Sequence, residues 1–206
     1  MNLKETYNKI ATDWFQDHHL DDWWIDGTNH FISLLKSGDV VLDAGCGAGV
    51  KSKYLIDRGM KVIGVDFSEK LLEIAEQQAP LATFHIMDMK DVGTLKTHFD
   101  GVFAQASLLH IPKKEIVDVI ERLVSVLKVN GYIYIAVKGM RPNGREEEIV
   151  TENDYGYDYA RFFSYYRMDE LENYFRICKL NVMYRNIKTV GRTDWLQIIG
   201  QKNTRK

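Results

Sequence analysis

Short apolar runs alternate with stretches of helical periodicity from residue 40 onward. Runs rich in Val, Ile and Phe are typical of buried strands, and the sequence predicts such strands at residues 40–42, 61–65, 83–86, 100–104 and 132–137. Between them, apolar residues recur every three or four positions, which predicts helices over residues 50–58, from Ser68 onward, and from Pro112 to Asn130. This alternation predicts an α/β fold in which helices cover both faces of a mostly parallel sheet.

The segments that flank this core have a different pattern. Residues 3–36 read as two amphipathic helices, so residues 1–36 are predicted to form a helical lid. Residues 138–166 are polar and rich in tyrosine, and we interpret them as a long insertion that lines a binding pocket. A helix over residues 169–178 and two closing strands, at 179–187 and 195–200, complete one domain of residues 1–206.

Composition narrows the class of protein. The chain has 206 residues, of which 45% are hydrophobic and 27% charged, as in ordinary globular domains. Its formal net charge is -2, which does not favour a general nucleic-acid binder. The two cysteines, Cys46 and Cys178, make no disulfide framework and favour a reducing compartment. With no signal peptide and no apolar run long enough to cross a membrane, the prediction is a cytoplasmic protein that does not contact membranes.

The most specific pattern is the turn from Asp43 to Gly49, with the sequence DAGCGAG. A buried strand runs directly into three glycines at alternate positions, which allow a sharp turn and the close approach of a ligand to the backbone. Nicotinamide enzymes carry G-x-G-x-x-G at this place, whereas Val50 stands here where their third glycine would be. The spacing therefore disfavours a nicotinamide cofactor.

Two acidic residues follow the next strands. Asp66 ends the second strand, about twenty residues after the first glycine, where a carboxylate can hold ribose hydroxyls. Asp88 ends the third strand, where it can accept from an adenine amino group while Met89 packs on the ring. Because the carboxyl ends of parallel strands share one edge of a sheet, these residues and the glycine turn are predicted to lie together.

With these motifs in this order, the chain resembles the class I S-adenosylmethionine (SAM)-dependent methyltransferases, in particular the small-molecule enzymes. The resemblance covers nearly the whole length and includes the glycine turn, both acids, the segment 99–112 with its "SLLH" before a proline, and the ending at 194–202. It implies a Rossmann-like, doubly wound sheet of seven strands with an antiparallel last strand. It also implies SAM as cofactor and a small molecule as methyl acceptor.

The resemblance further implies roles for individual residues. Asp43 would stabilise the amino group of SAM or the loop, and Asp66 would hold the ribose. Tyr7 would cover the cofactor, since it begins a "Y-x-x-x-A" segment that ends at Ala11. The remaining cofactor contacts would come from Gly45, Gly47 and Gly49 at the methionine part, Phe67, Asp88 and Met89 at the adenine, and Ala104 to Ser107, with Gln105, at the sulfonium.

His110 is the candidate general base, because it follows the fourth strand and histidine titrates near neutral pH. A structural role for His110, orienting the loop before Pro112, is an equal alternative. Arg161 and Arg192 are candidates for facing the pocket and binding an acidic substrate. Methyl transfer needs no metal, and no clustered Cys or His spacing suggests one.

Two alternatives to a small-molecule enzyme remain open at this stage. The first is methylation of RNA or of a protein, which would need a charged docking face. The second is a non-catalytic SAM-binding module, which would keep the glycines and Asp66 without an open path to the methyl group. The sequence leaves the acceptor and the oligomeric state undetermined.

Overall fold

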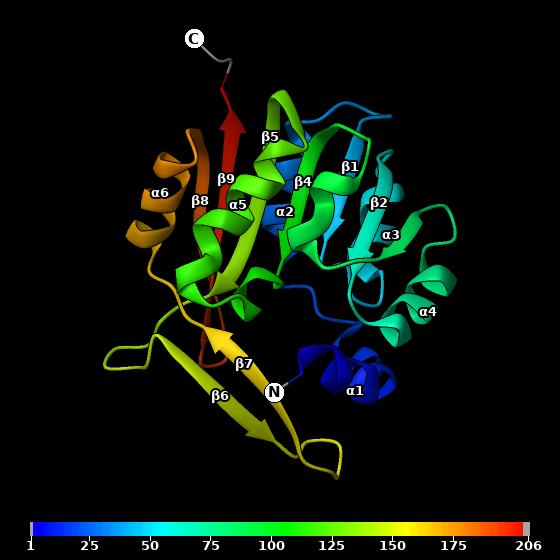
Figure 1. Cartoon of the computed structure of the whole chain (residues 1–206), viewed down its shortest axis with the longest axis vertical. Helices are drawn as coiled ribbons and strands as arrows, with labels where there is room; N and C mark the ends of the chain where they lie inside the picture. The colour runs from blue at the N-terminus through cyan, green and yellow to red at the C-terminus, as the bar shows by residue number, and fades with distance from the viewer. Residues whose placement is uncertain (1, 204–206) are drawn as a thin grey trace.

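The computed structural model describes residues 2–203, and a seven-stranded sheet forms its centre (Figure 1). The strand order is β3-β2-β1-β4-β5-β9-β8. β9 pairs antiparallel with β5 and β8, whereas the pairings among β3, β2, β1, β4 and β5 are parallel. This confirms the predicted Rossmann-like sheet. The strands are β1 (Val40–Ala44), β2 (Lys61–Asp66), β3 (Thr83–Ile86), β4 (Phe99–Gln105), β5 (Leu127–Lys138), β8 (Leu180–Val190) and β9 (Thr193–Lys202).

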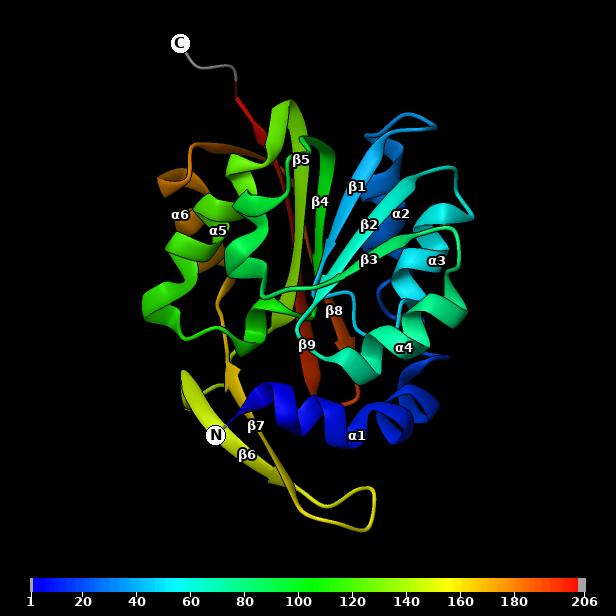
Figure 2. The same cartoon turned by 45° about the vertical axis from the view of Figure 1, so that its right-hand side comes forward.

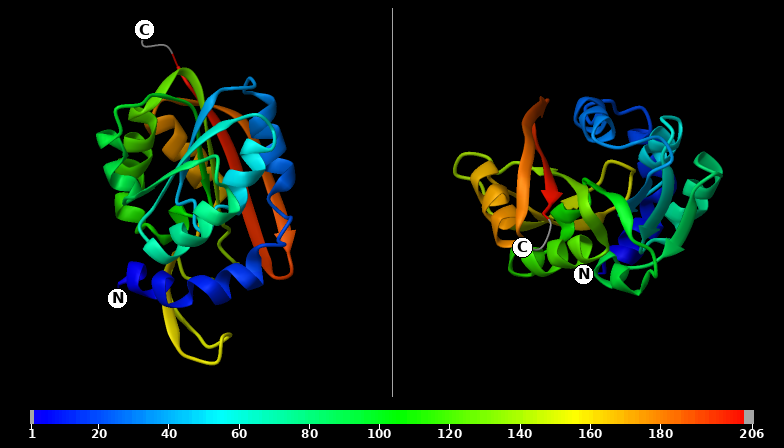
Figure 3. Two further views of the ribbon diagram at one scale, coloured as in Figure 1. Left: turned by 90° about the vertical axis from the view of Figure 1, so that its right-hand side faces the viewer. Right: turned by 90° about the horizontal axis from the view of Figure 1, so that it is seen from above.

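Helices cover both faces of the sheet (Figures 2 and 3). One face carries α2 (Ile25–Ser33), α3 (Val50–Ile56) and α4 (Glu69–Gln78), and the other carries α5 (Ile116–Ser125) and α6 (Met168–Ile177). α5 illustrates how apolar residues at helical spacing predict a helix that packs on the sheet. Its apolar residues recur with this spacing and are buried against the sheet. These residues are Ile116, Val119, Ile120 and Leu123.

Two further elements lie across the carboxyl edge of the parallel strands, away from both helical layers (Figures 1 and 2). They are α1 (Leu3–His18) and a hairpin of β6 (Glu147–Glu152) and β7 (Tyr159–Ser164). The Thr6 hydroxyl donates to the Ala160 carbonyl at 3.1 Å, and the Tyr157 hydroxyl donates to Asp13 at 2.5 Å. α1 and the hairpin therefore form one continuous wall over this edge.

α1 is also fixed to the start of α4. Ser68 caps α4, as its side chain accepts from Leu71, and its hydroxyl donates to Asn8 Oδ1 at 2.7 Å. Asn8 Nδ2 donates to Glu69 at 2.8 Å, and Lys4 forms an ion pair with the same carboxylate. The predicted helical lid thus has defined contacts on both of its sides.

The insertion at 138–166 is more regular than the long loop expected from its polarity. β6 and β7 pair antiparallel from Glu147 opposite Ser164 to Glu152 opposite Tyr159. A two-stranded ribbon outside the main sheet can keep polar residues on its exposed face, so it needs no continuous apolar run. Polarity alone therefore concealed the strands.

The helix predicted from Pro112 to Asn130 is wrong at its end. α5 ends at Ser125, and β5 already begins at Leu127. The register moves from Phe99 opposite Leu127 to Gly101 opposite Tyr132, so residues 128–131 form a bulge in β5. Asn130 adopts a φ of 63° inside this bulge. Asn-Gly is equally compatible with a helix end and a bulge, and strand pairing decided between them.

Candidate functional site

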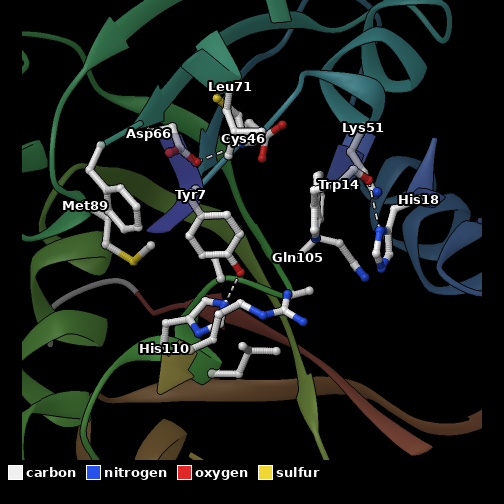
Figure 4. A pocket seen from close by; sticks show the side chains of 18 of the residues that line it. Tyr7, Trp14, His18, Cys46, Lys51, Asp66, Leu71, Met89, Gln105 and His110 are labelled. Atoms are coloured by element: carbon white, nitrogen blue, oxygen red, sulfur yellow. Dashed lines mark hydrogen bonds between the residues drawn. The ribbon is translucent and has the colours of Figure 1, made fainter. Parts of the chain in front are cut away.

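A cavity lies between the carboxyl edge of the sheet and the wall of α1 and the β6–β7 hairpin (Figure 4). Its floor is made by the ends of β1, β2, β4 and β5, and the strand order reverses between β1 and β4. Open α/β sheets bind ligands at such a reversal, outside the carboxyl ends of the strands. The edge of the sheet that the sequence predicted as a binding site therefore borders a cavity.

The glycine turn after β1 has three glycines in the left-handed region, with φ of 77° at Gly45, 53° at Gly47 and 76° at Gly49. Gly45 and Gly47 line the cavity. Gly49 has a different function, because a Cβ there would lie 2.8 Å from the Ala75 Cα in α4. The structure therefore places Gly49 at the packing of α3 on α4, outside the cavity lining.

Asp66 joins the two loops that border the cavity. Its carboxylate accepts from the Gly47 N–H and from the Ser68 N–H, both at 2.9 Å, and only 8% of the residue is exposed. Burial raises the pKa of Asp66 to about 6, although these backbone donors oppose the shift. A carboxylate has more acceptor positions than these two bonds use, so it can also accept from ligand hydroxyls.

Asp43 and Lys51 lie at the other side of the glycine turn. Asp43 is buried and accepts from the Ser52 hydroxyl at 2.6 Å. Burial raises the pKa of Asp43 to about 7 and lowers the pKa of Lys51. Both residues line the cavity, so this part can receive a ligand that carries both an ammonium and a carboxylate. Sequence reasoning missed Lys51.

The far side of Asp66 is apolar. Phe67, Met87 and Met89 line the cavity and also a second, adjoining hollow that contains Asp88. The Asp88 carboxylate accepts from the Lys90 N–H at 2.9 Å, which fixes its direction. A flat ring between Phe67 and Met89 would have an acidic residue near its edge.

Tyr7 and His110 meet above the end of β4 (Figure 4), with the Tyr7 oxygen 2.6 Å from His110 Nε2. His110 Nδ1 lies 2.7 Å from the Phe162 carbonyl. Because a carbonyl only accepts, Nδ1 carries the proton and Nε2 accepts from the tyrosine hydroxyl. Burial, with the nearby charges of Arg161 and Lys138, lowers the pKa of His110 to about 3. The imidazole is therefore neutral and already hydrogen-bonded.

Gln105 ends β4 and faces the cavity (Figure 4), whereas its neighbour Ala104 is fully buried outside the cavity lining. Both polar atoms of the Gln105 amide are buried and have no hydrogen-bond partner within residues 2–203. Unpaired buried amides are rare because each lost bond is costly. A ligand that hydrogen-bonds Gln105 would remove this cost.

The part of the cavity beyond Gln105 contains cations and aromatic rings. Arg161 lines it as predicted, whereas Arg192 is exposed in the turn between β8 and β9. Sequence reasoning missed Lys138, which lies 4.1 Å from the Phe163 ring centre and 5.9 Å from that of Trp195. A signal was present, because Lys138 is the last residue of a strand whose end is buried, as Asp66 is.

Comparison with known proteins agrees with this geometry. Residues 41–131, which include the glycine turn and both strand-end acids, match a family model described as a methyltransferase domain. A SAM-dependent methyltransferase from Methanosarcina mazei has the same fold, with a TM-score of 0.72 and 22% identity over 84% of this chain and 96% of that one. The matched segment is thus similar to a methyltransferase domain, and structural neighbours with the same fold are SAM-dependent methyltransferases.

The proteins to which this chain is similar differ in acceptor. A ubiquinone biosynthesis O-methyltransferase of Dechloromonas aromatica is 29% identical over 70% of this chain and 66% of its own length. In this and four other curated relatives, the matched part spans 38% to 66% of the relative's length. A Burkholderia thailandensis 1,6-didemethyltoxoflavin-N1-methyltransferase, solved with its acceptor and S-adenosylhomocysteine, has a TM-score of 0.77 at 17% identity, covering 98% of this chain and 88% of that one.

Several solved structures with this fold contain SAM or S-adenosylhomocysteine. Within residues 2–203, no helix of this chain is long and apolar enough to cross a membrane. The same residues contain no group of three His, Cys, Asp or Glu side chains that could hold a metal ion.

Proposed function

We propose that this protein transfers the methyl group of SAM to an oxygen, nitrogen or sulfur atom of a small molecule. The observation that carries the proposal is the position of Asp66, buried at the cavity floor and bonded to the glycine turn. It fits a ribose beside a backbone that a ligand can approach closely. The unpaired amide of Gln105 supports a polar ligand in the same cavity.

The lining residues suit the parts of the cofactor in one order. Asp66 would hold the ribose, and Phe67 and Met89 would border the adenine with Asp88 at its edge. Gly45 and Gly47 would border the methionine part, with Asp43 for its ammonium and Lys51 for its carboxylate. Tyr7 would cover the cofactor from α1, and Gln105 would border the sulfonium end.

The transfer itself needs alignment more than covalent help. SAM supplies an activated methyl group on its sulfonium. The acceptor atom uses a lone pair to form a bond to the methyl carbon as the carbon–sulfur bond breaks. The electron pair of the broken bond stays on sulfur, which gives S-adenosylhomocysteine. Where the acceptor atom carries a proton, that proton leaves to solvent or to a basic group of the acceptor pocket.

The expectation that His110 is the base is revised in this proposal. A ring whose pKa is lowered to about 3 is a weak proton acceptor at neutral pH, and its Nε2 already accepts from Tyr7. His110 is instead a positioning residue that holds the Tyr7 hydroxyl over the cavity. This is the structural alternative, acting through Tyr7 rather than through the loop before Pro112.

The variant His110→Ala is expected to weaken S-adenosylhomocysteine binding about fivefold to tenfold, because Tyr7 loses a buried hydrogen-bond partner. Calorimetry on His110→Ala, Tyr7→Phe and the double variant measures the coupling. If His110 acts through Tyr7, the double variant binds no more weakly than the weaker single variant. Losses that multiply in the double variant would show that the two residues act independently.

A small acceptor is favoured by the closed form of the site. α1 and the β6–β7 hairpin cover the cavity, which leaves little room for a folded macromolecule. The net charge of -2 also gives no support to an RNA substrate. A non-catalytic SAM-binding module is disfavoured because the cavity continues past Gln105 to His110 and Lys138. The cytoplasmic location remains a prediction from the sequence.

The first experiment is a calorimetric titration of the protein with SAM, with S-adenosylhomocysteine and, as a control, with NADH. Binding of both sulfur nucleotides, with dissociation constants of about 1–100 µM, and no binding of NADH is the expected result. Binding of NADH alone would indicate that the glycine turn binds a nicotinamide cofactor, as in dehydrogenases. Binding of none of the three would refute the proposed function.

A further inference from the structure

Lys138 lies on the acceptor side of the cavity. The glycine turn follows β1 and Asp66 ends β2, so the cofactor occupies the β2–β1 half of the sheet edge. Lys138 ends β5, which is separated from β1 by β4. A group bound by Lys138 is therefore beyond the sulfonium end of the cofactor, where the acceptor must enter.

The charge of Lys138 is not balanced by a carboxylate. Among the residues that the structure describes, no Asp or Glu lies within ion-pair distance of its ammonium. Burial, followed by repulsion from Arg161, lowers the pKa of Lys138 to about 8. An anion that binds beside this buried ammonium is stabilised by it, because the lysine was already removed from water when the protein folded.

The neighbouring cation, Arg161, is in the opposite situation. Its Nε and Nη2 donate to the Glu152 carboxylate at 2.7 Å and 2.6 Å, so its charge is balanced within the hairpin. With the Arg161–Glu152 pair neutral, Lys138 is the remaining positive charge of the two cations that line this half of the cavity. A single negative charge would balance it, whereas a phosphate dianion would leave an excess.

Aromatic surfaces surround the ammonium. Phe163 and Trp195 both line the cavity and face Lys138, and Trp195 stacks on Trp23 with 3.8 Å between ring centres. Flat apolar molecules gain free energy against such rings. The cavity thus presents a cation beside apolar faces, which suits a molecule with one acidic end and a flat body.

The carboxylate of the cofactor does not need Lys138. Lys51 lies in the first turn of α3, the helix after the glycine turn, and also lines the cavity. Each of the two lysines therefore has its own anionic partner when cofactor and acceptor are both bound.

We propose that the methyl acceptor is a small, flat carboxylic acid whose carboxylate is bound by Lys138 and whose body packs against Phe163 and Trp195. This inference rests on the proposed methyl-transfer function and specifies its acceptor. In this inference Lys138 determines which acceptor is bound and takes no part in binding the cofactor.

The test uses protein saturated with S-adenosylhomocysteine and titrated with matched pairs of probes. The pairs are benzoate and benzamide, 4-hydroxybenzoate and 4-hydroxybenzamide, and indole-3-acetate and indole-3-acetamide. Quenching of tryptophan fluorescence reports binding in the cavity, which Trp14, Trp23 and Trp195 line, and calorimetry gives the affinity. At least one acid is expected to bind about tenfold or more tightly than its amide, the usual effect of one charge-assisted bond.

Variants at Lys138 test whether the preference for the acid comes from the charge of this residue or from the shape of the site. Lys138→Gln is expected to remove the preference for the acid, and Lys138→Arg to keep part of it, while both bind S-adenosylhomocysteine as the wild type does. Lys114→Gln removes an exposed lysine outside the cavity and is the matched control. Thermal unfolding of each variant checks that it is folded.

The outcomes distinguish this inference from the proposed function. If wild-type protein does not bind S-adenosylhomocysteine, the proposed function itself fails. If it does bind, three results each overturn the acceptor inference alone. These are amides that bind as tightly as their acids, no acid that binds below about 10 mM, and an acid preference that persists in Lys138→Gln.

Discussion

The variant Asp66→Ala is expected to bind S-adenosylhomocysteine at least about 100-fold more weakly than the wild type. The carboxylate is placed to accept from two ribose hydroxyls, and each bond to a charged acceptor contributes about 1.5–3 kcal/mol. It also fixes the Gly47 and Ser68 N–H groups, so its loss loosens the glycine turn as well. Calorimetric titration of the variant measures the effect directly.

Glu76→Ala is the matched control for Asp66→Ala, because Glu76 is an exposed acid on α4. Its affinity for S-adenosylhomocysteine is expected to equal that of the wild type. Thermal unfolding of Asp66→Ala shows whether the variant is folded. Burial raises the pKa of Asp66 to about 6, so above pH 6 the buried charge costs stability, and its removal limits the loss of stability in the variant. A folded Asp66→Ala protein with wild-type affinity would mean that other residues hold the ribose.

The second large effect is expected at Gly45. A Cβ at this position would overlap the Ser107 side chain and lie 3.2 Å from the Met89 Cε, and the φ of 77° is unfavourable for any other residue. Gly45→Ala is expected to lower the free energy of unfolding by about 2–5 kcal/mol, from backbone strain and overpacking together. Because the turn must shift to relieve the overlap, cofactor binding is lost as well.

Gly38→Ala separates strain from overlap. Gly38 has a similar φ of 88°, but no atom lies within 4 Å of an added Cβ. Its substitution is expected to cost only the backbone term, about 1–2 kcal/mol, and to leave cofactor affinity unchanged. Equal unfolding midpoints in urea for the two variants would show that Ser107 moves aside without cost, contrary to the packing seen here.

Much of the fold was predictable because β1 and β2 are short apolar runs that are each followed by a helix. The run before Asp43 and the run before Asp66 form β1 and β2, and the strand-end rule placed both acids on one edge. The β6–β7 hairpin and the end of α5 were not predictable in this way. The end of α5 depends on the pairing of β5 with β4, and β6 and β7 pair with each other outside the main sheet, where no continuous apolar run is required.

The candidate site was predictable on its cofactor side and less so elsewhere. Gly45, Gly47 and Asp66 belong to one short motif, whereas Gly49 owes its place to a contact with α4. The state of His110 depends on Tyr7, 103 positions away, and on the Phe162 carbonyl, 52 positions away. No local pattern encodes such a neighbourhood, so its chemistry follows from the folded structure.

The wall over the cavity joins segments that are very far apart in the chain. Thr6 is bonded to Ala160 across 154 positions, and Tyr157 to Asp13 across 144. Closing a loop of that length in an unfolded chain costs about 4 kcal/mol of entropy, which a few surface hydrogen bonds do not recover. The sheet must therefore assemble first and bring both segments to one edge. During refolding, native strand pairing precedes a competent site, and the cavity is among the last parts of the molecule to form.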